Sequence, residues 1–260
     1  MRGGGRGRER GYNPCMLVTT PAVVLHAFRY GETSKIVRLS TRDHGVQSVL
    51  AKGATRSKSR FGARLQVLSE GMACFYLKAH RDLHTLSAFD VTTQRLELAG
   101  DLNRYASASA LAELVLRCSP AEPHPEIFHL LSAALDRLVS AEREAVEVVA
   151  LASLWSVVVA LGFAPAVDAC VRCGKPPAER AAFSLAEGGL LCARCGRGVR
   201  GAALGRADQA ALAAFVDGST DVPPLPAKHL VAHRRLLARF VRQHLSEDRE
   251  LNALTFWEGR

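Results

Sequence analysis

"AVVLHAFRYGETSKIVRLSTRDHGVQSVLAK", residues 22–52, carries the pattern from which the architecture follows. It contains three short runs rich in β-branched and other apolar residues, separated by the turn-forming sequences "YGETS" and "RDHG". Short apolar runs bounded by such turn residues are typical of β-strands. We therefore predict strands at 22–28, 35–41 and 46–52.

Two further runs extend this pattern, at 72–79 and 83–90, and the sequence "HRD" between them suits a hairpin. Five short strands within about seventy residues are typical of a small barrel, of which the OB-fold is a common kind. We predict an OB-fold nucleic-acid-binding domain over 20–91. The Gly- and Arg-rich segment 1–19 before it has too little apolar surface to fold, and we expect a disordered basic tail there.

After about residue 100 the apolar residues recur at helical spacing. Asp101 is a plausible N-cap, and we predict helices at 102–118, 126–140, 143–162, 206–217 and 227–246. A helical domain thus occupies 92–169 and 201–250, with an insertion at 170–200 and a C-terminal tail at 251–260. The expected fold is α+β and multidomain: a five-stranded OB-fold β-barrel, then an α-helical domain carrying a four-cysteine, zinc-ribbon-like insertion.

One segment has the length and composition of a membrane span, because residues 148–167 carry no charge. Gly162 and Pro165 would end a helix early, however, and no basic cluster flanks the segment. We interpret it as a buried core helix. The N-terminal sequence has no apolar secretory segment, so we expect a cytoplasmic protein without a membrane partner.

Positive charge is unevenly distributed along the 260 residues. The formal net charge is +9, of which residues 28–64 alone contribute +7, from nine basic and two acidic side chains. Residues 65–169 carry −6, and residues 170–260 carry +5. Such asymmetry favours one region built for an anionic ligand and another built for packing or for a basic partner.

The basic region is the candidate nucleic-acid site, because OB-folds bind single strands through a basic groove and stacking aromatic rings. Phe61 could stack on a base, and Phe28 and Tyr30 lie near the end of the first strand; alternatively the loop is merely solvated and Phe61 belongs to the core. Residues 35 and 38 should face opposite sides of their strand. The candidate DNA-binding residues are Lys35, Arg38, Lys52, Arg56, Lys58, Arg60 and Arg64.

Four of the seven cysteines form two CxxC pairs, Cys170 with Cys173 and Cys192 with Cys195. This spacing is typical of a zinc ribbon, in which four thiolates hold one structural zinc ion and leave no position for a catalytic water. Iron, a redox dithiol and unliganded thiols remain alternatives. Glycine after each second cysteine, at 174 and 196, suits the tight backbone turn that such a site needs. We expect the other three cysteines, Cys15, Cys74 and Cys118, to be inert.

The last long helix is also basic, and the surroundings of the cysteines carry further arginines. His229 and His233 are four residues apart, but "HLVAH" lacks the glutamate of a zinc protease, so we interpret them as surface or core histidines. No catalytic constellation is present in the sequence, and we expect no enzyme activity. The basic residues concerned are Lys228, Arg234, Arg235, Arg239 and Arg242 on the helix, and Arg172, Arg194, Arg197 and Arg200 near the cysteines, which either extend a DNA surface or only solvate the ribbon.

Several ordered segments resemble the RecO family of bacterial recombination mediators, and the match spans nearly all of residues 21–246. The N-terminal tail lies outside it. The matching segments are "YGETSKIV", the residues from Thr41 to Gly45, "AKGATRSKSRFGARLQ", "RDLHTL", "ALGFAPAVDACVRCGK" and "FSLAEGGLLCARC".

The resemblance implies a DNA-binding recombination mediator in DNA repair, nucleoid-associated and without enzyme activity. It implies binding of single- and double-stranded DNA, annealing of complementary strands, and work with RecR to place RecA on strands coated by single-strand-binding protein. Contact with the acidic C-terminal tail of that coating protein would fit the basic C-terminal helix. The alternative from a different class is a zinc-ribbon protein-interaction adaptor without intrinsic DNA binding.

Overall fold

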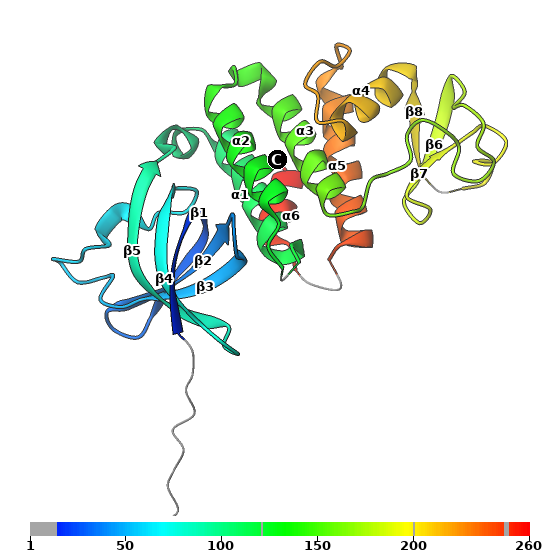
Figure 1. Ribbon diagram of the computed structural model, residues 1–260. Helices are drawn as coiled ribbons and strands as arrows, with labels where there is room; N and C mark the ends of the chain where they lie inside the picture. Colours follow the sequence, from blue (N-terminus) through cyan, green and yellow to red (C-terminus); the bar gives the residue numbers. More distant parts are fainter. Residues whose placement is uncertain (1–14, 121, 200, 247–249) are drawn as a thin grey trace, which may run out of the picture.

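The computed structural model describes residues 15–120, 122–199, 201–246 and 250–260. A β-barrel lies at one end, a bundle of helices occupies the middle, and a small three-stranded sheet lies at the far end (Figure 1). This arrangement confirms the predicted fold class. The expected tail over residues 1–14 lies outside the described part of the chain.

The barrel is closed by five strands in the order β1-β2-β3-β5-β4, which confirms the predicted OB-like architecture. All neighbouring strands pair antiparallel except β3 and β5, which pair parallel through only three residues of each. Inward side chains alternate with outward ones, so that Val37, Leu39 and Val49 fill the barrel core. The strands are β1 (Cys15–Tyr30), β2 (Ser34–Thr41), β3 (Gly45–Ala51), β4 (Glu70–Lys78) and β5 (Leu83–Thr93).

The first strand is more than twice as long as predicted, and the expected disordered tail is wrong for its last five residues. β1 begins at Cys15 and pairs with β4 through residues 15–23 before it pairs with β2 through residues 22–30. One strand thus closes the barrel by serving two neighbours in turn, with a register shift between Val24 and His26. Long-range pairing orders residues 15–19, which composition alone does not reveal.

The helical region follows the predicted order, and the N-cap prediction at Asp101 is confirmed. Its carboxylate accepts hydrogen bonds from the backbone N–H groups of Asn103 at 2.8 Å and Arg104 at 3.0 Å. The helices are α1 (Leu102–Cys118), α2 (Pro125–Ser140), α3 (Val146–Ala160), α4 (Arg206–Val216), α5 (Ala227–His244) and α6 (Asn252–Glu258), with short 3₁₀ turns η1 (Gly62–Arg64), η2 (Leu96–Gly100) and η3 (Arg143–Ala145).

The predicted C-terminal tail at 251–260 is wrong, because α6 forms there and packs into the helical core. Leu254 and Trp257 are fully buried, and the N–H of Leu254 donates to the carboxylate of Glu113 on α1 at 2.9 Å. Burial of two large apolar side chains holds this short helix, which would be unstable alone.

Helix α3 lies at the centre of the helical core and, after Glu147 in its first turn, carries no charged residue. Its residues from Val149 to Trp155 are buried without interruption, which confirms the core-helix interpretation of residues 148–167. No helix in the described ranges is both long enough and apolar enough to span a membrane.

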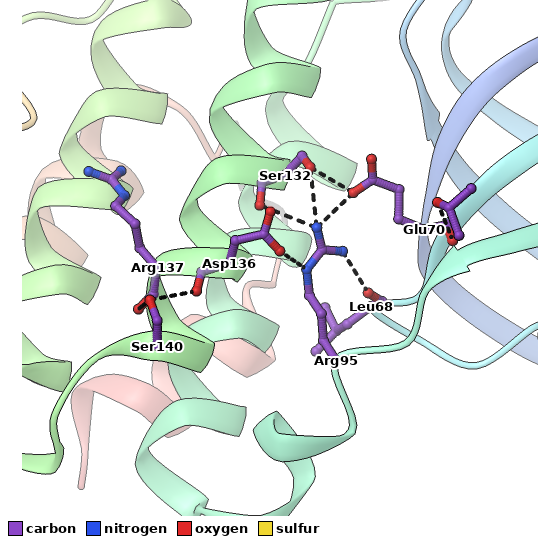
Figure 2. A network of polar contacts seen from close by, with 8 residues as sticks. Leu68, Glu70, Arg95, Ser132, Asp136, Arg137 and Ser140 are labelled. Atoms are coloured by element: carbon purple, nitrogen blue, oxygen red, sulfur yellow. Dashed lines mark hydrogen bonds and ion pairs between the residues drawn. The ribbon is translucent and has the colours of Figure 1, made fainter.

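The barrel and the helices share one polar junction around Arg95, which follows β5. Its guanidinium contacts the carboxylates of Glu70 on β4 and Asp136 on α2, each at 2.7 Å, and also donates to the carbonyl of Leu68 (Figure 2). Only 3% of the Arg95 side chain is exposed. Ion pairs from one buried arginine therefore join elements of both domains.

The insertion builds a small sheet in the order β7-β6-β8, from β6 (Arg180–Ser184), β7 (Gly189–Leu191) and β8 (Ala202–Gly205). Since β8 belongs to this sheet, the structural unit extends five residues beyond the predicted limit of 200. Phe183 and Leu190 are completely buried in the helical core, where Phe183 packs edge-on against Phe240 of α5. One face of the insertion is thus anchored by apolar packing, and the cysteines lie on its other side.

Candidate functional site

The four predicted cysteines come together as one cluster, in which all Sγ atoms lie within 4.8 Å of one another. The Sγ atoms of Cys173 and Cys192 are 3.7 Å apart. With a zinc–sulfur distance near 2.3 Å, tetrahedral ligands should lie about 3.8 Å apart. The donor set and its spacing therefore fit one metal ion held by four thiolates.

The backbone around the cluster favours ionised sulfur. Backbone N–H groups, that of Cys192 foremost, lower the pKa of the Cys170 thiol to about 6. By contrast, hydrogen bonding with Cys173 and then with Cys192 raises the pKa of Cys195 to about 12. Four sulfurs this close cannot all carry a negative charge unless a cation compensates them. A bound cation would remove the conflict.

Each CxxC hook is closed by a tight turn, and the two glycines play different roles. The N–H of Gly174 donates to the carbonyl of Cys170 and that of Gly196 to the carbonyl of Cys192, both at 2.8 Å. Gly174 has φ +68°, which disfavours any other residue. Gly196 lacks a positive φ, but its Cβ position would lie only 3.1 Å from the side chain of Ala182.

The arginines near the cysteines divide into structural and exposed groups. Arg172 forms a bidentate ion pair with Glu187 and donates to the carbonyl of Cys195 at 3.1 Å, so it supports the cysteine cluster. Arg194 and Arg197 are exposed. Arg200 lies outside the described residues.

The basic loop between β3 and β4 presents most of its cations to solvent. Lys52, Arg56, Lys58 and Arg60 are exposed, and within the described ranges none of the four makes an ion pair. Arg64 is exposed as well but lies 3.7 Å from the carboxylate of Asp90. These residues form a locally unneutralised basic surface, which we call the basic loop (residues 52–64).

Phe61 is the only aromatic residue of the basic loop, and its side chain is buried. Only 1% of it is exposed, and it packs in the barrel core with the Arg60 guanidinium 5.0 Å from its ring centre. The core alternative is therefore correct, and Phe61 does not offer a stacking face. It fixes the loop to the barrel instead.

Exposed aromatic rings lie on β1. Phe28 and Tyr30 are 43% and 52% exposed, and the ring centres of His26 and Phe28 are 5.6 Å apart. Alternation along β1 places all three on the outer face, opposite the inward Ala27. The N–H of Thr55 donates to the carbonyl of Thr33, which ties the basic loop to the turn just after Tyr30. Strand parity in the sequence could have identified this outer face.

Lys35 and Arg38 lie on opposite faces of β2, as their spacing predicts. Lys35 pairs with Ala51, at the barrel end where the basic loop begins. Arg38 points outward, and burial together with the nearby Arg117 of α1 lowers its pKa. The structure therefore groups Lys35 with the basic loop and sets Arg38 apart from it.

Two of the five basic residues of helix α5 form ion pairs with carboxylates of the helical domain. Arg234 pairs with Glu147 and Arg242 with Glu258, at 3.2 and 2.6 Å. The remaining three are exposed and line a hollow of about 430 Å³ with an apolar floor, which no sequence pattern had indicated. They are Lys228, Arg235 and Arg239.

The two histidines of α5 both face Asp208 at the start of α4. The Nδ1 atom of His229 lies 2.8 Å from an Asp208 carboxylate oxygen, and the Nε2 atom of buried His233 lies 3.3 Å from the same oxygen. These contacts join α4 to α5, which is the structural role expected from the sequence.

Comparison with known proteins covers almost the entire chain. The family model described as "Recombination protein O N terminal" matches residues 16–95, and "Recombination protein O C terminal" matches residues 99–252.

Three curated relatives bear the name DNA repair protein RecO. The protein from Anaeromyxobacter sp. (strain K) is 36% identical over 240 residues, which is 88% of this chain and 91% of the relative. That from Anaeromyxobacter dehalogenans (strain 2CP-1) is 37% identical over 235 residues, 86% and 89% of the two chains. The protein from Rubrobacter xylanophilus is 35% identical over 182 residues, 69% and 71% of the two chains.

Proposed function

The chain belongs to the RecO family of DNA repair proteins, and from this premise we propose that it is a DNA-binding recombination mediator. In this proposal it binds single- and double-stranded DNA and anneals complementary strands. With RecR it helps to load RecA onto strands coated by single-strand-binding protein. It acts in the cytoplasm, associated with the nucleoid, and through binding and not through catalysis.

The observation that carries this proposal is the basic loop beside exposed aromatic rings. Four exposed cations without ion pairs lie next to the end of β1, where Phe28 and Tyr30 face solvent. Cations that hold phosphates and rings on which bases stack are the two components of single-strand binding by OB-folds. Neither component reads base edges, so we propose binding without sequence preference.

The salt dependence of DNA binding tests the assignment. If Lys52, Arg56, Lys58, Arg60 and Arg64 each neutralise one phosphate, log affinity for single strands should fall with log salt at a slope of roughly −3.5. Replacing Arg56 and Arg60 together by glutamate should make the slope shallower, at about −2 or closer to zero, and should abolish annealing. Fluorescence anisotropy of a labelled oligonucleotide measures the first effect.

The matched control reverses two exposed arginines of α5, Arg235→Glu with Arg239→Glu, so that the change in net charge is equal. We expect this variant to keep the wild-type slope and annealing rate. Equal losses in both variants would mean that net charge and not the basic loop governs binding. A wild-type slope near zero would refute phosphate binding altogether.

We propose that the metal bound by the four cysteines is zinc and that its role is structural. All four ligands come from the protein, so zinc would supply no open coordination position for catalysis. Held there, it would join the two CxxC hooks across the face of the insertion that lies away from the apolar anchor of Phe183.

For the partners, we propose that the acidic C-terminal tail of single-strand-binding protein contacts the hollow on α5. Lys228, Arg235 and Arg239 offer three cations around an apolar floor that includes Leu236, and three cations suit an acidic peptide. The control variant above should therefore lose binding of a tail peptide while it keeps DNA binding. Retained binding of the tail peptide would place its site elsewhere.

The alternative is an interaction adaptor that binds no DNA by itself. An electrophoretic mobility shift with several unrelated oligonucleotides separates the two, because an adaptor should shift none of them. The basic loop favours DNA binding, since the cores of protein–protein interfaces are depleted of charged residues and this loop exposes four unpaired cations.

A further inference from the structure

A second hollow, of about 710 Å³, opens in the side of the barrel where its sheet is incomplete. Because β3 pairs with β5 only through residues 48–50, the first residues of β3 have no neighbour on that edge. The hairpin between β4 and β5 stands across this gap. The hollow is lined by Met16, Arg38, Val46, Gln47, Ser48, Leu77, Lys78, Ala79, Arg81, Asp82 and His84.

Three cationic side chains and one acidic side chain line this hollow. In the described chain, neither Arg38 nor Lys78 nor Arg81 makes an ion pair. The Nε atom of Arg38 is buried and has no hydrogen-bond partner. A buried guanidinium N–H without an acceptor is costly, and an anion bound beside it would supply one.

Two neutral side chains that can donate hydrogen bonds, His84 and Ser48, also line the hollow. The backbone N–H of Lys78 donates to the Nδ1 atom of His84 at 3.2 Å, so the neutral ring carries its proton on Nε2. Burial, and secondly the charge of Lys78, lowers the pKa of His84 and keeps the ring neutral at pH 7. The side chain of Ser48 lines the hollow as a further donor.

The hollow is distinct from the basic loop. The loop is tied to the β1–β2 turn, next to Lys35, whereas Arg38 lies on the other face of β2 and roughly 10 Å further along the strand. A single phosphate cannot contact both. Sequence reasoning placed Arg38 in the loop's interface and did not identify Lys78, Arg81 or His84 at all.

We propose that this hollow is a separate phosphate-binding site, which takes one phosphate-bearing nucleotide either from a DNA strand or free in solution. Two arginines and a lysine that line one hollow are typical of phosphate recognition. The volume suits a nucleotide, and Met16 and Leu77 offer apolar contact to a base or sugar. With a DNA strand as the source, the inference rests on the proposed function; with a free nucleotide it does not.

The test uses the full chain and titrates inorganic phosphate, thymidine monophosphate and a twenty-residue oligothymidylate. The Nε2–H signal of His84 in a proton–nitrogen NMR spectrum reports on the hollow. We expect it to shift and saturate in the wild type, with at least tenfold weaker binding in the variant Lys78→Gln with Arg81→Gln. The matched control, Lys52→Gln with Lys58→Gln in the basic loop, should bind phosphate and thymidine monophosphate like the wild type.

The oligonucleotide distinguishes the two sources. If the hollow holds one phosphate of a DNA strand, the salt slope of the Lys78→Gln with Arg81→Gln variant should be shallower by about 0.7, the contribution of one phosphate. An unchanged slope with lost thymidine monophosphate binding assigns the hollow to free nucleotides. Wild-type binding of all three probes by this variant would overturn the proposal. Failure of the wild type to bind DNA, with phosphate still bound, would refute the proposed function but support this site.

Discussion

The barrel and the helical domain use their arginines in opposite ways. In the basic loop Arg56 and Arg60 are exposed and make no ion pair in the described chain. In the helical domain Arg104 donates to the carbonyls of Leu138 and Ala141 at the C-terminal end of α2, at 2.6 and 2.7 Å. There the guanidinium satisfies carbonyls that a helix end leaves without partners.

The same contrast separates the two strongly basic parts of the sequence. Residues 170–260 carry a formal +5, but Arg172, Arg234 and Arg242 are held by carboxylates within the structure. Net charge therefore exaggerates what the second region can offer to DNA. The unpaired arginines of the basic loop are expected to act on a ligand, and the internally bonded Arg104, Arg234 and Arg242 of the helical domain are expected to act on stability.

The largest effect should come from the cysteine cluster, where the proposed metal, and not an arginine, would neutralise charge. Replacing Cys170 and Cys192 together by serine should remove the metal, with a loss on the order of 10 kcal/mol of binding free energy. Atomic emission spectroscopy should find about one zinc per wild-type chain and none in the variant.

The double cysteine variant should also lose order in the insertion while the helical domain stays folded. Because Phe183 and Leu190 are buried in the helical core, the helices should keep their circular dichroism while residues 170–200 become susceptible to protease. A fully folded, protease-resistant variant without metal would contradict a structural role. A control variant, Cys118→Ser, should leave the zinc content unchanged.

The next largest effect should come from Arg95, the buried arginine between the two domains. Arg95→Leu leaves the carboxylate of Glu70 without its charged partner, although Ser132 still donates to it at 2.6 Å. We expect the free energy of unfolding to fall by about 3 kcal/mol, as for a buried pair that has lost one member. Urea unfolding followed by fluorescence measures it.

Arg56→Leu is the matched control, since the same substitution is made at an exposed arginine. It should change the free energy of unfolding by less than about 0.5 kcal/mol and weaken DNA binding instead. Similar destabilisation by both substitutions would remove the distinction between ligand-binding and structural arginines.

Local patterns in the sequence were sufficient for much of this structure. Alternation and turn residues placed all five barrel strands, an N-cap placed the start of α1, and the CxxC spacing identified the cysteine cluster. Each of these depends on residues close together in the chain, or on a chemical rule that needs no knowledge of the fold.

Long-range contacts explain what the sequence did not reveal. The partner of Arg234 is Glu147, 87 residues away, and the first half of β1 is ordered by its pairing with β4, in which Cys15 lies opposite Lys78. Phe61 is buried because the loop folds back over the barrel, not because of its neighbours in sequence. The hollow around Arg38 combines residues of all five barrel strands and of the hairpin between β4 and β5, so no single segment marks it.

The smallest effect on stability should come from Asp101, whose carboxylate caps the start of α1. Hydrogen bonds from the backbone N–H of Arg104 and then of Asn103 lower the pKa of Asp101. A carboxyl whose pKa is lower in the folded protein contributes stability above its unfolded pKa of about 4 and loses it as the pH falls through the folded pKa. Asp101→Ala should therefore cost about 1 kcal/mol at pH 7, and this difference should shrink below about pH 4.

Asp101→Asn separates the charge from the cap, because asparagine accepts the same hydrogen bonds without ionising. Its unfolding free energy should stay close to that of the wild type at pH 7, and the gap between the asparagine and alanine variants should not depend on pH. Urea unfolding of the three proteins between pH 3 and 7 measures both differences. If the asparagine variant loses as much unfolding free energy as the alanine variant, the ionised carboxylate and not the cap geometry stabilises the start of α1. The charge of Asp101 would then act on stability, as the internally bonded arginines of the helical domain do.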